Sequence, residues 1–97
     1  MALMRSDYNK LKMYRKRIDK LNEEIIGLFG QRIKLSLEIH KIKKKLNLSS
    51  VDKAREKEVL ENAKMSAKRF KINPVLARRI MKILMAYNHN GLKKWWP

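Results

Sequence analysis

The sequence lacks several features on which common folds and sites depend. It has no cysteine, so neither a disulfide framework nor a thiolate metal site can form, which fits a cytoplasmic protein. Only three glycines and two prolines occur in 97 residues, and this scarcity of helix breakers favours helix. No apolar run is long enough to span a bilayer, and the first residues, MALMRSDYNK, have no apolar core of the signal-peptide kind. We therefore expect a single all-α domain over residues 1–97.

Negative charge is scarce as well. The chain carries 25 Lys and Arg against 9 Asp and Glu, which gives a formal net charge of +16. A field of this sign attracts anions and accelerates their arrival. Charge by itself does not distinguish between nucleic acid, an acidic membrane surface and a small polyanion as the partner.

The sequence contains one long repeat of apolar residues, which we call the seam. Its spacings alternate between three and four, as in a coiled coil, and predict a first helix over about residues 7–46, capped by Ser6 or Asp7. A helix of that length measures about 60 Å, too long for a small globular monomer, and must pack along a partner, most simply a second copy. The seam residues are Leu11, Tyr14, Ile18, Leu21, Ile25, Leu28, Leu35, Ile39, Ile42 and Leu46.

Two shorter helices are expected after the seam ends. Ser49, Ser50 or Asp52 can cap a second helix over about residues 52–70. Asn73 followed by a proline predicts a third helix over about residues 74–90, which Gly91 would end, leaving a short tail over 91–97. The expected inward faces are Ala54, Val59 or Leu60, Ala63, Ala67 and Phe70 on the second helix, and Leu76, Ile80, Ile83, Leu84 and Tyr87 on the third.

A cation occupies one position of the seam. The repeat predicts an apolar residue at position 32, and the sequence has Arg32 there. A guanidinium on a packing surface is costly unless an anion meets it, although an arginine can also extend out of a seam or pair with a glutamate. Lys43 follows 11 positions later, on the same face and about 16 Å along the axis. Alone, Lys43 would be a solvated member of the run KIKKK.

Arg15 borders the same seam. It precedes Arg32 by 17 positions, or about 25 Å along one helix, so the two side chains cannot hold one small ligand from the same chain. In an antiparallel dimer, Arg15 of one chain could reach the ligand that Arg32 of the other chain holds. Taken alone, Arg15 would be an ordinary surface charge in the run YRKR.

A mixed cluster of charges opens the second helix. Asp52 is most simply its cap, and Arg55 and Glu56 are most simply solvated; if this end folds over the first helix, they add a cation and an acceptor for a hydroxyl. His40 and His89 have no companion at metal-ligand spacing, so no metal site is expected. No phosphate-binding loop or nucleophile–histidine constellation is present. An enzyme built from this sequence would work through cations and hydrogen bonds.

The stretch from YRKRIDK to LENA resembles the all-helical chorismate mutases. The family pattern reads Arg-x-x-Ile-Asp, then an Arg, then Ile-x-x-x-Lys, then Asp-x-x-Arg-Glu, and the sequence follows it without a gap. The resemblance covers about residues 11–90 and implies an intertwined homodimer of three-helix chains, in which each site takes one arginine from the other subunit. The matching residues are Arg15, Ile18, Asp19, Arg32, Ile39, Lys43, Asp52, Arg55 and Glu56.

The resemblance also implies a role for each charged residue. Arg15 from the other subunit and Arg32 would hold the two carboxylates of chorismate, and Lys43 would hold the side-chain carboxylate and the ether oxygen. Asp52, through its backbone, and Glu56 would accept the ring hydroxyl. At the margin of the site, Arg55 would lie at the edge of the pocket and Asn88 near the ring carboxylate.

The implied reaction is the [3,3] rearrangement of chorismate to prephenate in the biosynthesis of phenylalanine and tyrosine. It needs no cofactor, because the site holds the substrate compact and stabilises the charge that grows on the ether oxygen. One position departs from the family pattern. Where the family usually has a Gln or Glu that donates to the ether oxygen, this sequence has Leu92. Lys93 and Asn90 are the candidate replacements.

Two other functions fit parts of the sequence. The first is isochorismate-pyruvate lyase, which shares the fold and the cations. The second is a basic helical module in which Trp95 and Trp96 stack on bases while Lys93 and Lys94 contact phosphates. The tryptophans are more simply an apolar plug, and nucleic-acid binding does not explain why Arg32 interrupts the seam. A small dianion is therefore the favoured partner, with neither nucleic acid nor a membrane expected.

Overall fold

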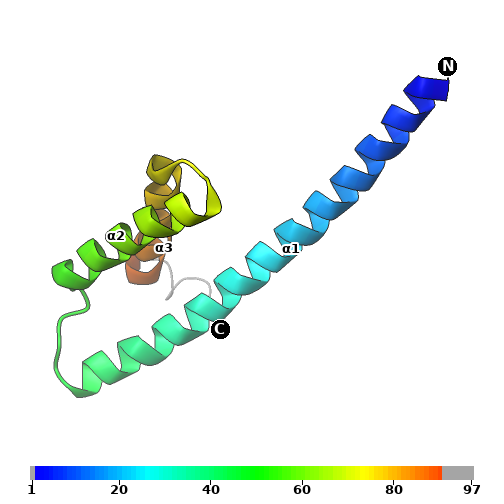
Figure 1. Cartoon of the computed structure of the whole chain (residues 1–97). Coiled ribbons are helices and arrows are strands. Elements are labelled where there is room, and N and C mark those ends of the chain that lie inside the picture. Colours follow the sequence, from blue (N-terminus) through cyan, green and yellow to red (C-terminus); the bar gives the residue numbers. More distant parts are fainter. Residues whose placement is uncertain (1, 91–97) are drawn as a thin grey trace. The chain divides into compact units, whose positions relative to one another are not determined.

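The protein is described here by a computed structural model that places residues 2–90, with side chains from Met4 to Tyr87. Figure 1 shows three helices, α1 (Ala2–Lys45), α2 (Lys53–Phe70) and α3 (Pro74–Asn90). No strand occurs among residues 2–90. The prediction of an all-helical chain with one long and two shorter helices is confirmed. None of the described helices combines the length and the apolar character needed to cross a membrane.

Helix α1 starts at Ala2, before the predicted start near residue 7. Its first residues, ALMR, are strong helix formers. Met4 and Tyr8 also continue the spacing of the seam toward the N-terminus. The prediction that Ser6 or Asp7 caps this helix is therefore wrong, because both residues lie inside it.

A left-handed residue ends α1. Asn47 has a φ of 56°, and asparagine is one of the few residues besides glycine that adopts this conformation readily. The Leu48 N–H donates to the Lys43 carbonyl at 2.8 Å, and the Asn47 N–H donates to the Lys44 carbonyl at 3.2 Å. These bonds satisfy carbonyls that the end of the helix would otherwise leave without partners.

Helix α2 ends in the same way. Lys71 has a φ of 57°, and its backbone N–H reaches the carbonyls of Ala67 and Lys68. After this turn, the Asn73 side chain accepts a hydrogen bond from the Val75 N–H at 2.8 Å and so caps α3. The chain thus reverses between its helices through short turns with defined hydrogen bonds.

Backbone packing divides the chain into two compact units, Met1–Lys34 and Leu35–Pro97. The described part of the first unit consists of α1 residues alone. The second unit contains the C-terminal end of α1 together with α2 and α3, which pack against each other.

Small side chains form the core of the second unit. Ala63, Ala67 and Ala77 are its buried residues, and Met81 packs against them. Alanine lets two helices approach closely, because the interaxial distance depends on the side chains at the contact. The predicted inward positions of Ala63 and Ala67 are confirmed.

Several residues of the predicted inward faces do not lie inside. Phe70, Leu76 and Ile83 have exposed fractions of 67%, 52% and 68%, and the predictions for Ala54 and Tyr87 are wrong as well, because both are exposed. The contact between α2 and α3 uses their alanine faces, so α3 is rotated away from its predicted orientation. Within this chain, Leu76 and Ile83 are left uncovered, while the predicted inward residues Ile80 and Leu84 are half-buried.

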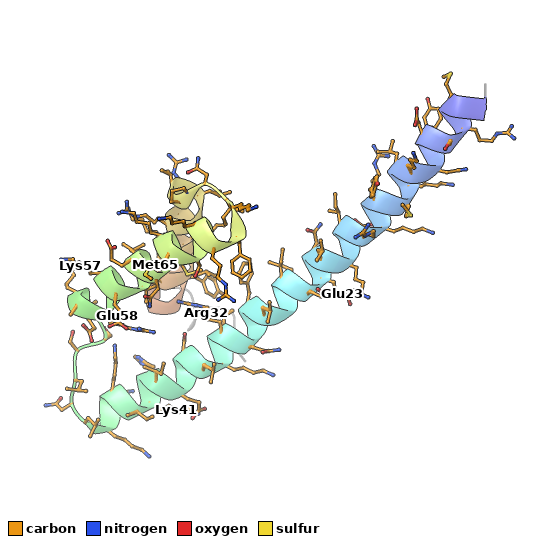
Figure 2. The ribbon with its side chains drawn as sticks, in the orientation of Figure 1. Glu23, Arg32, Lys41, Lys57, Glu58 and Met65 are labelled. Atoms are coloured by element: carbon orange, nitrogen blue, oxygen red, sulfur yellow. The ribbon has the colours of Figure 1, made fainter. Side chains whose placement is uncertain are left out.

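The seam of α1 is also uncovered in the single chain. All ten seam residues are exposed, with exposed fractions between 43% and 66%. Figure 2 shows the side chains that stand out along the whole of α1. A helix gains most of its stability from packing of its apolar face, and the seam of α1 has no such packing within the described chain.

Candidate active site

The first unit carries two of the predicted site residues. Arg15 and Arg32 both lie on α1, 17 positions apart, which corresponds to about 25 Å along the helix axis. Arg15 is exposed and Arg32 is half-buried. No small dianion spans that distance, so one copy of α1 does not bring these two guanidinium groups to the same ligand.

Lys43 lies in the second unit, in the last turn of α1. Its side chain is half-buried, and its ammonium group donates a hydrogen bond to the Ser50 carbonyl oxygen at 3.4 Å. This contact spans the turn between α1 and α2. It brings the Lys43 ammonium to the segment that leads directly into α2.

Asp52 and Glu56 open α2 from the other side of that turn. The Asp52 carboxylate accepts a hydrogen bond from the Arg55 N–H at 3.0 Å, as an N-cap should, and its carbonyl accepts one from the Glu56 N–H at 3.0 Å. Glu56 is half-buried, in the first turn of α2, where a negative charge interacts favourably with the helix dipole. The end of α1 and the start of α2 therefore carry two predicted cations, Lys43 and Arg55, and two predicted acids.

The other charges at this junction are arranged on the surface. Arg55 is exposed and pairs with Glu58, which Figure 2 labels on α2. Lys53 lies 3.9 Å from the Glu56 carboxylate, with most of its own side chain exposed. Exposed pairs of this kind contribute little to stability, about 0–1 kcal/mol each. Arg55 is thus on the surface, with a carboxylate of its own chain as its neighbour.

The remaining predicted residues lie at or beyond the limit of the described side chains. Asn88 and Asn90 belong to α3, but their side chains are outside the described part. Gly91, the predicted end of α3, lies outside the described residues altogether. Leu92 and Lys93 lie outside them as well. Trp95 and Trp96 also fall outside the described residues.

No group of three histidine or acidic residues within the described part could hold a metal ion. The chemical groups present at the candidate site are guanidinium, ammonium, carboxylate and backbone carbonyl. Such a set can bind carboxylates, accept a hydrogen bond from a hydroxyl and donate to a developing oxyanion.

Residues 14–90 match the family described as chorismate mutase type II. The chain belongs to this family. A chorismate mutase from Methanocaldococcus jannaschii is similar to it, with 28% identity over 79 residues, which cover 81% of this chain and 80% of that relative. No solved structure matches the chain at a significant level.

The family assignment bears directly on the predicted function. Chorismate mutases are isomerases, so the chain is an enzyme of that class. Both matches are to mutases, and they favour neither the isochorismate-pyruvate lyase nor the nucleic-acid-binding module. The matched range begins just before Arg15 and ends beyond Asn88.

One contact of the site was not predicted from the sequence. The Ser50 carbonyl is a backbone group, and no residue type identifies in advance a carbonyl that will accept a bond from Lys43. A usable signal was Asn47, because asparagine directly after a helical segment is typical of a left-handed helix end. That signal predicts a tight reversal but not the partner of Lys43.

Proposed function

We propose that two copies of this chain form a homodimer with two shared active sites, each of which converts chorismate to prephenate. The observation that carries the proposal is the position of Arg15 and Arg32 on one helix, about 25 Å apart, beside an uncovered apolar seam. A second copy of α1 would cover the seam and would also supply the second arginine.

The energetics favour this pairing. Burying a large apolar side chain contributes about 1.5–3 kcal/mol, and the ten seam residues are roughly half exposed, so covering them contributes about 1 kcal/mol each. Two chains together would gain about 20 kcal/mol, an upper estimate, against an association cost of about 4–15 kcal/mol. The seam alone is therefore sufficient to hold a dimer.

In the proposed site, Arg32 of one chain and Arg15 of the second copy each bind one carboxylate of chorismate. Lys43 binds the side-chain carboxylate and the ether oxygen, while Glu56 and the Asp52 backbone accept the ring hydroxyl. Arg55 lies at the edge, and Asn88 lies near the ring carboxylate. The family resemblance supports these roles, and so does the junction that places Lys43 beside the start of α2.

The reaction is unimolecular, so the site acts by restricting the substrate. Anchored at both carboxylates, chorismate is held in the compact form in which the two reacting carbons lie close together. As the ether C–O bond breaks, negative charge grows on the oxygen, and the Lys43 ammonium stabilises it more than it stabilises the ground state. No cofactor and no proton transfer are required.

A second donor to the ether oxygen would come from the end of α3. The usual Gln or Glu of the family is replaced by Leu92 in this chain, and Asn90 and Lys93 are the candidate replacements. The product, prephenate, would enter the biosynthesis of phenylalanine and tyrosine in the cytoplasm.

Exchange between two inactive variants tests the shared site. Arg15→Ala and Arg32→Ala chains should each be inactive as homodimers. After random exchange in equal amounts, half of the dimers are mixed, and each mixed dimer has one intact site of two, so about a quarter of wild-type activity should return. The measurement is loss of chorismate by absorbance.

Two outcomes would contradict the proposal. If both variants fold and exchange subunits but no activity returns, the site is not shared between chains. If the wild-type chain consumes isochorismate but not chorismate, the lyase is the correct function.

A further inference from the structure

The turn between α1 and α2 (residues 46–52) holds the ammonium group that the proposed mechanism uses. We infer that this turn is a positioning device for Lys43 and that the left-handed residue Asn47 sets its shape. The inference rests on the proposed function, in which Lys43 contacts the ether oxygen. It concerns how the reactive conformation of Lys43 is prepared before the substrate arrives.

Both ends of Lys43 are attached to the turn. Its backbone carbonyl accepts a hydrogen bond from the Leu48 N–H at 2.8 Å, and its ammonium donates to the Ser50 carbonyl at 3.4 Å. The Val51 N–H donates to the Ser49 hydroxyl at 3.2 Å, which fixes the backbone on both sides of Ser50. The turn therefore constrains where this lysine side chain can extend.

The number of donors on the ammonium matches the proposed chemistry. A lysine ammonium has three N–H donors, and the Ser50 carbonyl takes one of them. Two donors remain, one for the side-chain carboxylate of the substrate and one for its ether oxygen. Because the carbonyl is neutral, it holds the ammonium without cancelling the positive charge that attracts the substrate.

The benefit of this arrangement is entropic. A free lysine side chain has up to about 2 kcal/mol of rotamer entropy to lose when it is fixed in place. Holding the ammonium in advance means that less of this cost falls on the transition state. The expected consequence is a higher kcat rather than tighter binding of the ground state.

The Ser50 carbonyl is a backbone group, so a side-chain substitution does not remove it. The turn can instead be perturbed by substituting Asn47. Asn47→Gly keeps the left-handed conformation, whereas Asn47→Val disfavours it by about 1–2 kcal/mol. The chain also offers a matched control. Lys71 is the other described left-handed residue that is not glycine, and it ends α2 with the same kind of hydrogen bonds.

The experiment compares Gly and Val at each of the two positions. We expect Asn47→Val to lower kcat about tenfold, with KM within twofold, while Asn47→Gly stays within twofold of wild type. Lys71→Val should lower the melting temperature relative to Lys71→Gly without changing kcat per folded dimer. In a Lys43→Ala background, Asn47→Val should cause no further loss, because the group that the turn positions is absent.

A second readout does not depend on activity. Acylation of lysine amines, followed by peptide mass spectrometry, reports how freely Lys43 reacts relative to the exposed Lys57. Asn47→Val should increase the relative labelling of Lys43 several-fold, and Lys71→Val should not. This readout distinguishes the inference about the turn from the proposed function. A chain with no mutase activity would refute the proposed function, but its Lys43 labelling would still test whether the turn holds the lysine.

Three results would overturn the inference. The first is an equal loss of kcat for Asn47→Val in the wild-type and Lys43→Ala backgrounds. The second is a kcat loss per folded dimer at Lys71→Val as large as that at Asn47→Val. The third is unchanged labelling of Lys43 in Asn47→Val.

Discussion

The two compact units of this chain differ in how far their helices are packed against other helices of the chain. The second unit buries alanines between α2 and α3 and so builds a small core of its own. The described part of the first unit is the stretch of α1 up to Lys34, and its seam side chains remain exposed. The contrast indicates that small residues make the contacts between helices of this chain, whereas the large apolar residues of the seam remain exposed within it.

The strongest test of this contrast places a carboxylate on each kind of surface. Ile25 is 46% exposed on the seam, and Met65 is 70% exposed on α2. Ile25→Asp should shift the protein from dimer to monomer and lower activity at least about 100-fold, because an unpaired charge buried in an interface costs several kcal/mol. Sedimentation analysis and chorismate consumption measure the two effects.

Met65→Asp is the control for that experiment. The Ile25 and Met65 side chains are both exposed in the single chain, so their burial in that chain does not predict which substitution is harmful. Met65→Asp should remain dimeric, with activity within about twofold of wild type. Equal tolerance of both substitutions would show that no second copy covers the seam.

A smaller effect is expected from enlarging the core of the second unit. Ala67 is fully buried between α2 and α3. Ala67→Leu should lower the free energy of unfolding by about 1–3 kcal/mol through overpacking, as measured by urea titration. The matched substitution Ala54→Leu, at an exposed position of the same helix, should change it by less than about 0.5 kcal/mol. If Ala67→Leu left the free energy of unfolding unchanged, the close packing of α2 against α3 at their alanines would be contradicted.

The smallest effect concerns the cap of α2. Asp52→Ala removes the acceptor of the Arg55 N–H and should cost about 1 kcal/mol of stability, while Asp52→Asn should cost only a few tenths. If Asp52 contacts the substrate through its backbone, both variants should keep KM within about twofold per folded dimer. A large rise in KM for Asp52→Asn would instead give the Asp52 carboxylate a direct role in binding.

Much of the fold followed from local patterns in the sequence. The seam predicted α1 because its spacing persists over many turns, and Asn73 before Pro74 predicted the start of α3. Local patterns only partly predicted which face of α3 packs inward, because Ile80 and Leu84 are half-buried but Leu76 and Ile83 are exposed. Leu76 and Ile83 are more hydrophobic than Ala77, so composition favoured these two positions over Ala77. The close approach that alanine permits decides the contact instead.

The candidate site was predictable to a similar extent. The cations Arg15, Arg32 and Lys43 stood out because they lie on or beside an apolar repeat. The contact between Lys43 and the Ser50 carbonyl was not predictable, because it depends on the path of the backbone through the turn. The pairing of Arg55 with Glu58 could be anticipated only as one of several possible exposed pairs at a helical spacing of three residues.

In the proposed dimer, the seam would also make protein concentration a determinant of stability. In a dimer of the proposed kind, the folded state of α1 depends on the presence of a second chain, so every tenfold dilution lowers the apparent stability by about 1.4 kcal/mol. Structure and catalysis would then be lost together on dilution. The cell's supply of this polypeptide would thereby set both how much enzyme exists and what fraction of it is folded.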